Sequence, residues 1–174
     1  MVEPRSLSFN NDRWLTDSRI YNLIWMGRWL ERAENIARVI NTFAGAAVES
    51  GSDIEWLQHS LVNAAVIRGI PIDDPTRTLS LLLREHNSSS IYHSIATARN
   101  NATQVGPVEL IRAISGIIQS IDEAALPIPT PDEARNLTNA VLEGLSSVYD
   151  VIEASWFHRE SMSEEEVYLR FVQQ

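Results

Sequence analysis

Residues 20–40, which read IYNLIWMGRWLERAENIARVI, carry apolar side chains at helical spacing. On a helix that turns by about 100° per residue, the apolar positions form one continuous arc and the charged positions form another. The apolar arc contains Leu23, Trp25, Met26, Trp29, Leu30, Ala33, Ile36, Ala37 and Ile40. The charged arc contains Arg28, Glu31, Arg32, Glu34, Asn35 and Arg38. This separation predicts a long amphipathic helix whose apolar arc faces a core.

The rest of the chain repeats the helical spacing, and no strand-like alternation lasts five residues. Glycines, prolines and capping residues such as Asp53, Asp74 and Thr130 separate the expected helices. These helices cover, in order, residues 17–48, 53–68, 75–86, 90–105, 108–126, 131–156 and 163–174. Short helices are marginal by themselves and must bury their apolar faces against one another. The sequence therefore predicts an all-α bundle of six or seven helices, with residues 1–16 as a loose arm and residues 17–174 as a single domain.

The composition excludes several kinds of chemistry. The chain has no cysteine and no lysine, so all 14 basic residues are arginine. Disulfides, thiolate metal sites, cysteine nucleophiles, Schiff bases and a phosphate-binding lysine are therefore excluded. Arginine remains, as a permanent cation suited to bidentate contact with a carboxylate or phosphate.

Charge and hydropathy bear on partners and location. Residues 120–174 hold three arginines against eleven acidic residues, and this acidic final third argues against nucleic acid as a partner. No signal-peptide pattern opens the chain, and no apolar run approaches membrane-spanning length. We therefore expect a cytoplasmic protein that has no membrane partner.

Motifs for metals and cofactors are missing from the sequence. None of the four histidines follows a glutamate by three positions, the spacing that helical di-iron sites use. The seven glycines form neither a phosphate loop nor a nucleophile elbow. We expect no metal and no cofactor.

The charged arc of residues 20–40 has two interpretations. Glu34 precedes Arg38 by four positions and Arg28 precedes Glu31 by three, so these side chains could form ion pairs on a solvated face. Alternatively, the arc is covered and forms a buried network or an anion site. Gly27 lies in this arc and would allow another helix to approach closely there.

The stretch LIWMGRWLERAENIAR resembles the opening signature of the bacterial Alpha-E family of helical proteins, which typically reads Tyr-Trp-Met-Gly-Arg-Tyr-Leu-Glu-Arg-Ala-Glu-Asn-Thr-Ala-Arg. This chain has Ile24 and Trp29 in place of the two tyrosines and Ile36 in place of the threonine. The matching residues are Trp25, Met26, Gly27, Arg28, Leu30, Glu31, Arg32, Ala33, Glu34, Asn35, Ala37 and Arg38. Because the match concentrates on the charged arc, we predict that this arc is at least partly covered.

A second stretch, NSSSIYHSIATARNNAT, resembles the Asn-Pro-Ser-Ser-Ile segment of the same family and the Ala-Arg-Glu-Asn-Ala-Arg run that follows it. The family's glutamate is Asn100 here and its second arginine is Thr103, so only Arg99 is carried over as a charged site residue. Family members are usually longer and carry another Glu-Arg helix in their second half. We therefore expect this chain to correspond to the first half to two-thirds of a full-length member, truncated before that second element.

The resemblance also implies a functional setting. Alpha-E proteins commonly accompany ATP-grasp-like and transglutaminase-like proteins, so one hypothesis is an accessory or interaction domain in a peptide- or amide-forming system. The alternative is a small-molecule binder or an amide-processing enzyme, in which Arg28, Arg32 and Arg38 hold an anionic substrate and Glu31 or Glu34 acts as base. The sequence leaves open whether the chain is an enzyme and whether it forms a homo-oligomer.

Overall fold

The computed structural model describes residues 17–85, 87, 89–124, 128 and 130–156. The described residues form six α-helices and one short 3-10 helix, and none of them lies in a strand. These elements are α1 (Asp17–Ser50), α2 (Ile54–Ile67), η1 (Pro75–Arg77), α3 (Thr78–Leu83), α4 (Ile91–Val105), α5 (Val108–Glu123) and α6 (Pro131–Trp156). The all-α prediction is confirmed. The predicted arm (1–16) and the predicted last helix (163–174) lie outside the described residues.

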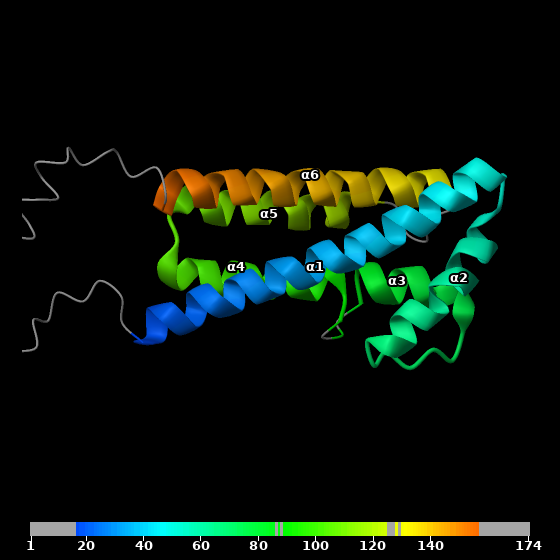
Figure 1. The fold of residues 1–174 in the computed structure, drawn as a ribbon, viewed down its shortest axis with the longest axis horizontal. Coiled ribbons are helices and arrows are strands. Elements are labelled where there is room, and N and C mark those ends of the chain that lie inside the picture. Colours follow the sequence, from blue (N-terminus) through cyan, green and yellow to red (C-terminus); the bar gives the residue numbers. More distant parts are fainter. Residues whose placement is uncertain (1–16, 86, 88, 125–127, 129, 157–174) are drawn as a thin grey trace, which may run out of the picture.

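Four of the helices form the body of the bundle. Helix α1 packs against α4 along one side and against α6 along another, while α5 packs against both α4 and α6 (Figure 1). Helices α2 and α3, joined through η1, cover one end and reach back to α1 and α4. At 1.5 Å per residue, the 34 residues of α1 extend over about 50 Å, so this helix contacts both the body and the end of the bundle.

The helices begin where the sequence supplies capping oxygens. The carboxylate of Asp53 accepts a hydrogen bond from the Trp56 N–H at 2.9 Å, and Thr130 Oγ1 accepts one from the Glu133 N–H at 3.2 Å. Asp74 also caps as predicted, but its proline-led segment starts as a 3-10 turn before it becomes α3. The predicted helix 75–86 is therefore split in two.

Apolar side chains from all six α-helices meet in one core. Its largest fully buried members include Leu30, Ile40, Leu61, Ile95 and Ile114. Helices α5 and α6 approach closely at Gly144, where an added Cβ would lie 2.6 Å from Ile117. A larger residue at position 144 would force the Ile117 side chain or the helices to shift.

The apolar arc predicted for α1 is buried over most of its length, from Met26 to Ile40. Trp25 is an exception, because 41% of it is exposed and it faces away from the core. Gly27 does not mark a helix crossing, since no heavy atom would lie within 4 Å of a Cβ placed there. Among the helices described, none combines the length and the apolar character needed to cross a membrane.

Candidate functional site

The charged arc of α1 divides into two sides with different neighbours. On the side that faces α6, Glu34 Oε1 accepts hydrogen bonds from Nη2 and Nε of Arg38 at 2.6 and 3.0 Å. The hydroxyl of Tyr149, on α6, donates to the other oxygen of Glu34 at 2.9 Å. The Glu34 side chain is 24% exposed, against 64% for Arg38. The predicted covering of the charged arc therefore holds at Glu34, whereas Arg28, Glu31, Arg32, Asn35 and Arg38 are exposed.

These contacts determine the protonation states of Glu34 and Tyr149. The hydrogen bonds from Arg38 lower the pKa of Glu34 below its usual value, and the bond from Tyr149 lowers it further against the opposing effect of burial. Burial raises the pKa of Tyr149, and its hydrogen bond to the Glu34 carboxylate raises it again. Glu34 is therefore ionised at neutral pH and Tyr149 keeps its proton. A carboxylate held in this way is a poor general base.

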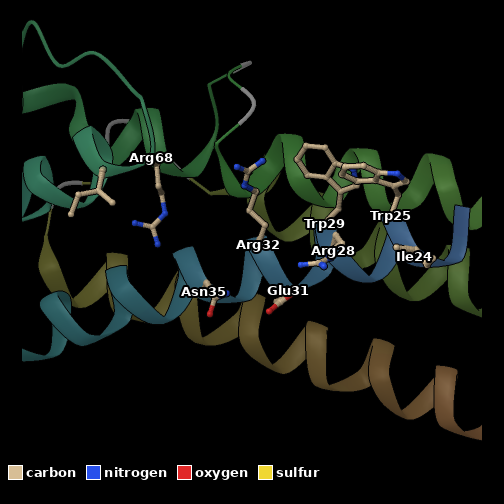
Figure 2. Close-up of a pocket in the computed structure, with 9 residues that line it drawn as sticks. Ile24, Trp25, Arg28, Trp29, Glu31, Arg32, Asn35 and Arg68 are labelled. Carbon is tan, nitrogen blue, oxygen red and sulfur yellow. The ribbon is translucent and has the colours of Figure 1, made fainter. Parts of the chain in front are cut away.

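The other side of the charged arc borders a groove between α1 and the last turn of α2. This groove has a volume of about 830 Å³. Helix α1 and the end of α2 line it with Ile24, Trp25, Arg28, Trp29, Glu31, Arg32, Asn35, Ile67 and Arg68 (Figure 2). Among the described residues, three guanidinium groups and one carboxylate thus line this groove. Within the part of the chain that the structure describes, neither Arg28 nor Glu31 forms an ion pair.

Arg68 reaches the groove because α2 ends directly before it. Its backbone N–H closes the helix on the carbonyls of Ala65 and Val66, and Gly69 follows in the left-handed conformation (φ +75°) that a glycine adopts without strain. The Arg68 carbonyl accepts a 3.0 Å hydrogen bond from the buried Ser89 hydroxyl. The backbone of Arg68 is therefore fixed from two directions.

The Arg68 guanidinium projects from this anchored backbone toward α1, and the Arg32 side chain extends away from α1 on the same side of the helix (Figure 2). Its Nη1 donates to the carbonyl of Ala64 at 3.0 Å, which leaves its other N–H groups for further contacts. Burial lowers the pKa of Arg68, and the positive charge of Arg32 lowers it further. An arginine stays protonated at neutral pH despite such a shift. An anion near both guanidiniums would offset this repulsion.

Two aromatic rings of α1, those of Trp25 and Trp29, also line the groove. Tyr21, Trp25 and Trp29 follow one another on successive turns of α1, with ring centroids 6.0 and 6.3 Å apart. Trp29 meets the edge of His93, from α4, at 5.6 Å. The guanidinium carbon of Arg32 lies 5.3 Å from the Trp29 ring centroid, within the range of a cation–π contact. The groove therefore offers a flat apolar surface beside its cations.

The structure places the seven candidate site residues in different surroundings. Of the seven candidate residues, Arg28, Glu31, Arg32 and Asn35 line the groove together. Glu34 and Arg38 belong to the α6 side, and Arg99, on α4, does not line the groove. Sequence reasoning missed Arg68 and Ile67 and placed Trp25 in the core. The exposed apolar run Val66–Ile67 immediately before Arg68 was the signal that could have pointed to the end of α2.

The described residues also bear on metal binding. No group of three or more histidine, aspartate or glutamate side chains among them could hold a metal ion. The polar groups of the groove are guanidiniums, one carboxylate and one amide. Guanidiniums bind anions, so these groups suit an anionic ligand better than a cation.

Comparison with known proteins gives one match. The model of the Alpha-E family, which is described as a predicted alpha-helical domain with a conserved ER motif, matches residues 18–163. This range takes in nearly all of the described helices. Glu31 and Arg32 form an adjacent Glu-Arg pair within it, and both line the groove. No curated protein and no solved structure matches the chain significantly.

Proposed function

This chain belongs to the Alpha-E family, and from that membership and the groove along α1 we propose that it is a binding domain that holds an anionic group of a partner. The observation that carries the proposal is the placement of Arg28, Arg32 and Arg68 around one groove. Three cations against one carboxylate leave the groove positively charged within a chain whose net charge is −9. A local field of this kind attracts and orients an acidic surface.

We propose that the domain is not catalytic by itself. Glu34, one of the two carboxylates considered as a base, lies on the α6 side and is held ionised by Arg38 and Tyr149. Glu31 does line the groove, but no described side chain activates it by hydrogen bonding. General base catalysis requires a group positioned and tuned for proton transfer. The groove supplies binding groups and lacks a tuned base among its described residues.

The resemblance to Alpha-E proteins suggests the setting. We propose that the anionic group belongs to an ATP-grasp-like or transglutaminase-like protein and that the domain serves as its accessory in a peptide- or amide-forming system. The groove and the exposed acidic residues of α6 give the domain two oppositely charged surfaces, which together would fix the orientation of such a partner.

The size of the groove favours a second candidate, an anionic small molecule. Its volume of about 830 Å³ falls within the range of small-molecule sites, about 300–1,000 Å³. Trp25 and Trp29 would contact an apolar part of such a ligand while the arginines bind its charge. The two candidates share the same residues and differ in what fills the groove.

One set of variants tests both candidates. We would mix the chain with an ATP-grasp-like or a transglutaminase-like protein encoded in the same genome and measure complex formation by size-exclusion chromatography. Thermal melting would be followed in parallel, with and without ATP, glutamate and short peptides. The test variant is Arg68→Gln, and the matched control is Arg112→Gln on α5, which does not line the groove.

A complex that Arg68→Gln disrupts and Arg112→Gln preserves would support the partner proposal. No complex, together with ligand-dependent melting that Arg68→Gln abolishes, would support the small-molecule candidate instead. If Arg68→Gln changes neither measurement, the groove is not a binding site and the proposal fails.

A further inference from the structure

The side chains that line the α1 wall of the groove fall into rows with a regular spacing. Ile24, Arg28 and Arg32 are four residues apart and occupy successive turns of one row. Side chains at this spacing have Cβ atoms about 5–6 Å apart. Along α1, the row therefore presents one apolar side chain followed by two cationic side chains.

An extended peptide repeats at nearly the same distance. Its residues rise about 3.3 Å each, so side chains on one face recur about every 6.6 Å. The small excess over the spacing of the helix row can be absorbed by the long, flexible arginine side chains. A peptide lying along the row could thus place every second side chain opposite Ile24, Arg28 and Arg32 in turn.

The two cationic positions of the row, Arg28 and Arg32, differ in how strongly they would bind an anion. Arg28 is the second arginine that α1 contributes, whereas Arg32 shares its part of the groove with Arg68, which extends toward α1 from the end of α2 (Figure 2). A carboxylate can accept hydrogen bonds from two guanidiniums. The position between Arg32 and Arg68 is therefore the stronger anion-binding position. Burial lowers the pKa of Arg68 and the charge of Arg32 lowers it further, which agrees with a second cation nearby.

The apolar end of the row, formed by Ile24 with the neighbouring Trp25, is exposed to solvent. Ile24 is 56% and Trp25 is 41% exposed, and the ring of Tyr21 continues the surface at 6.0 Å from Trp25. Exposed apolar and aromatic side chains that adjoin charged ones are typical of protein-recognition surfaces.

The side chains of Glu31 and Asn35 favour a peptide ligand over a phosphate ligand. They are four residues apart and form a second row that also lines the groove. A carboxylate accepts hydrogen bonds and an amide both donates and accepts, so this row suits the N–H and C=O groups of a peptide backbone. A polyphosphate has no donors to offer Glu31 and would be repelled by its charge.

We propose that the groove binds an extended acidic segment of a partner protein, in which an apolar residue and two acidic residues alternate with intervening residues. The apolar side chain lies on Ile24 and Trp25, the first carboxylate meets Arg28, and the second lies between Arg32 and Arg68. This inference rests on the proposed binding function and names the chemistry of its ligand.

The test uses blocked peptides of equal composition. The first is acetyl-Gly-Phe-Gly-Glu-Gly-Glu-Gly-amide, made also in the reverse order, and its control is acetyl-Gly-Phe-Glu-Glu-Gly-Gly-Gly-amide, in which the acids are adjacent. ATP and inorganic phosphate are the non-peptide probes. Binding to the full chain would be followed by the indole N–H signals of Trp25 and Trp29 in nitrogen-15 NMR spectra, assigned with single Trp→Phe variants, because this readout detects even weak complexes.

We expect one order of the alternating peptide to bind about tenfold more tightly than the control peptide, since only the alternating spacing places both carboxylates on guanidiniums. Arg68→Gln should remove this preference and Arg112→Gln should keep it. Equal binding of both peptides, or binding of phosphate and ATP without the peptides, would overturn the inference and leave the proposed anion-binding function standing. If no probe shifts either indole signal, the inference is overturned, and the proposed function then depends on the partner-complex experiment.

A double-mutant cycle tests the register directly. The first glutamate of the better-binding peptide is replaced by glutamine, and its affinity is measured for the wild type and for Arg28→Gln. If the two groups meet, the losses from the two changes should not add, because either change already removes the same contact. Full additivity would place the first carboxylate elsewhere and overturn the assignment of Arg28.

Discussion

The two sides of the α1 charged arc use the same residue types and reach opposite outcomes. On the α6 side, Glu34 receives hydrogen bonds from Arg38 and Tyr149 and is three-quarters covered. On the groove side, Arg28, Arg32 and Arg68 border open space. On the α6 side the charged groups pair with one another, whereas on the groove side positively charged groups outnumber negatively charged ones among the described residues.

The neighbours of α1 cause this difference. Helix α6 runs alongside α1 and supplies a tyrosine hydroxyl to the carboxylate it meets (Figure 1). On the groove side, α2 meets α1 only at one end, and the side chain it supplies there is another arginine. Pairing opposite groups stabilises a fold, whereas gathering like charges costs stability and is common at binding sites. This contrast supports the proposal that the α6 side stabilises the fold and that the groove side binds a partner.

The largest expected effect comes from the core beneath both sides. Leu30 is fully buried in the apolar arc of α1, and Leu30→Ala should lower the free energy of unfolding by about 2–5 kcal/mol through lost burial and a cavity. Urea denaturation followed by circular dichroism measures this change. The control is Ile67→Ala in the groove, where an 83% exposed side chain should matter by less than about 0.5 kcal/mol. Equal losses from both variants would mean that the groove wall is part of the core.

The α6 side should show a smaller stability effect. Tyr149→Phe removes a hydrogen bond to a half-buried carboxylate, and we expect a loss of about 1 kcal/mol, the typical value of such a bond. Tyr21→Phe is the matched control, since its ring is 61% exposed and no hydrogen bond from its hydroxyl to another described residue exists. If both variants unfold at the same urea concentration, Tyr149 does not hold α6 to α1 through Glu34.

The fold was predictable because its signals are local. Periodic apolar positions, Asp53 and Thr130 as caps, and Gly69 as a stop each act within a few residues of the chain. Helix boundaries depend on such local groups, so they can be read without knowing the packing. The split at Pro75, where a 3-10 turn precedes α3, was not predicted, although it is local as well.

The site was only half predictable because it depends on packing. The helical wheel placed Arg28 and Arg32 on one arc but could not show that Arg68, 36 positions beyond Arg32, would face them. It also placed Trp25 in the core, since periodicity gives the direction of a side chain and not the presence of a neighbour. None of the described helices covers α1 at Trp25, and its ring lines the groove instead.

A pH titration tests the α6 side through a smaller expected change in stability. The pKa of Glu34 is lower in the folded chain than its ordinary value of 4.5, so its contribution to stability is fully present above that pH and is lost as pH falls toward the folded pKa. Wild type should therefore lose its stability advantage over Glu34→Gln below about pH 4.5. Urea midpoints of both proteins, measured from pH 7 to pH 3, would show whether this difference closes.

The smallest expected effect concerns Arg68, and it has the opposite sign to the others. Removing one of two neighbouring cations relieves repulsion and desolvation, so Arg68→Gln should leave stability unchanged or raise it by at most about 0.5 kcal/mol. Arg38→Gln, which removes the partner of Glu34 on the α6 side, should instead lower stability by about 0.2–1 kcal/mol. Added salt should narrow both differences, because it screens repulsion and attraction alike. A marked loss of stability in Arg68→Gln would show that this guanidinium is held for the fold, through its bond to the Ala64 carbonyl, and the contrast between the two sides of α1 would disappear.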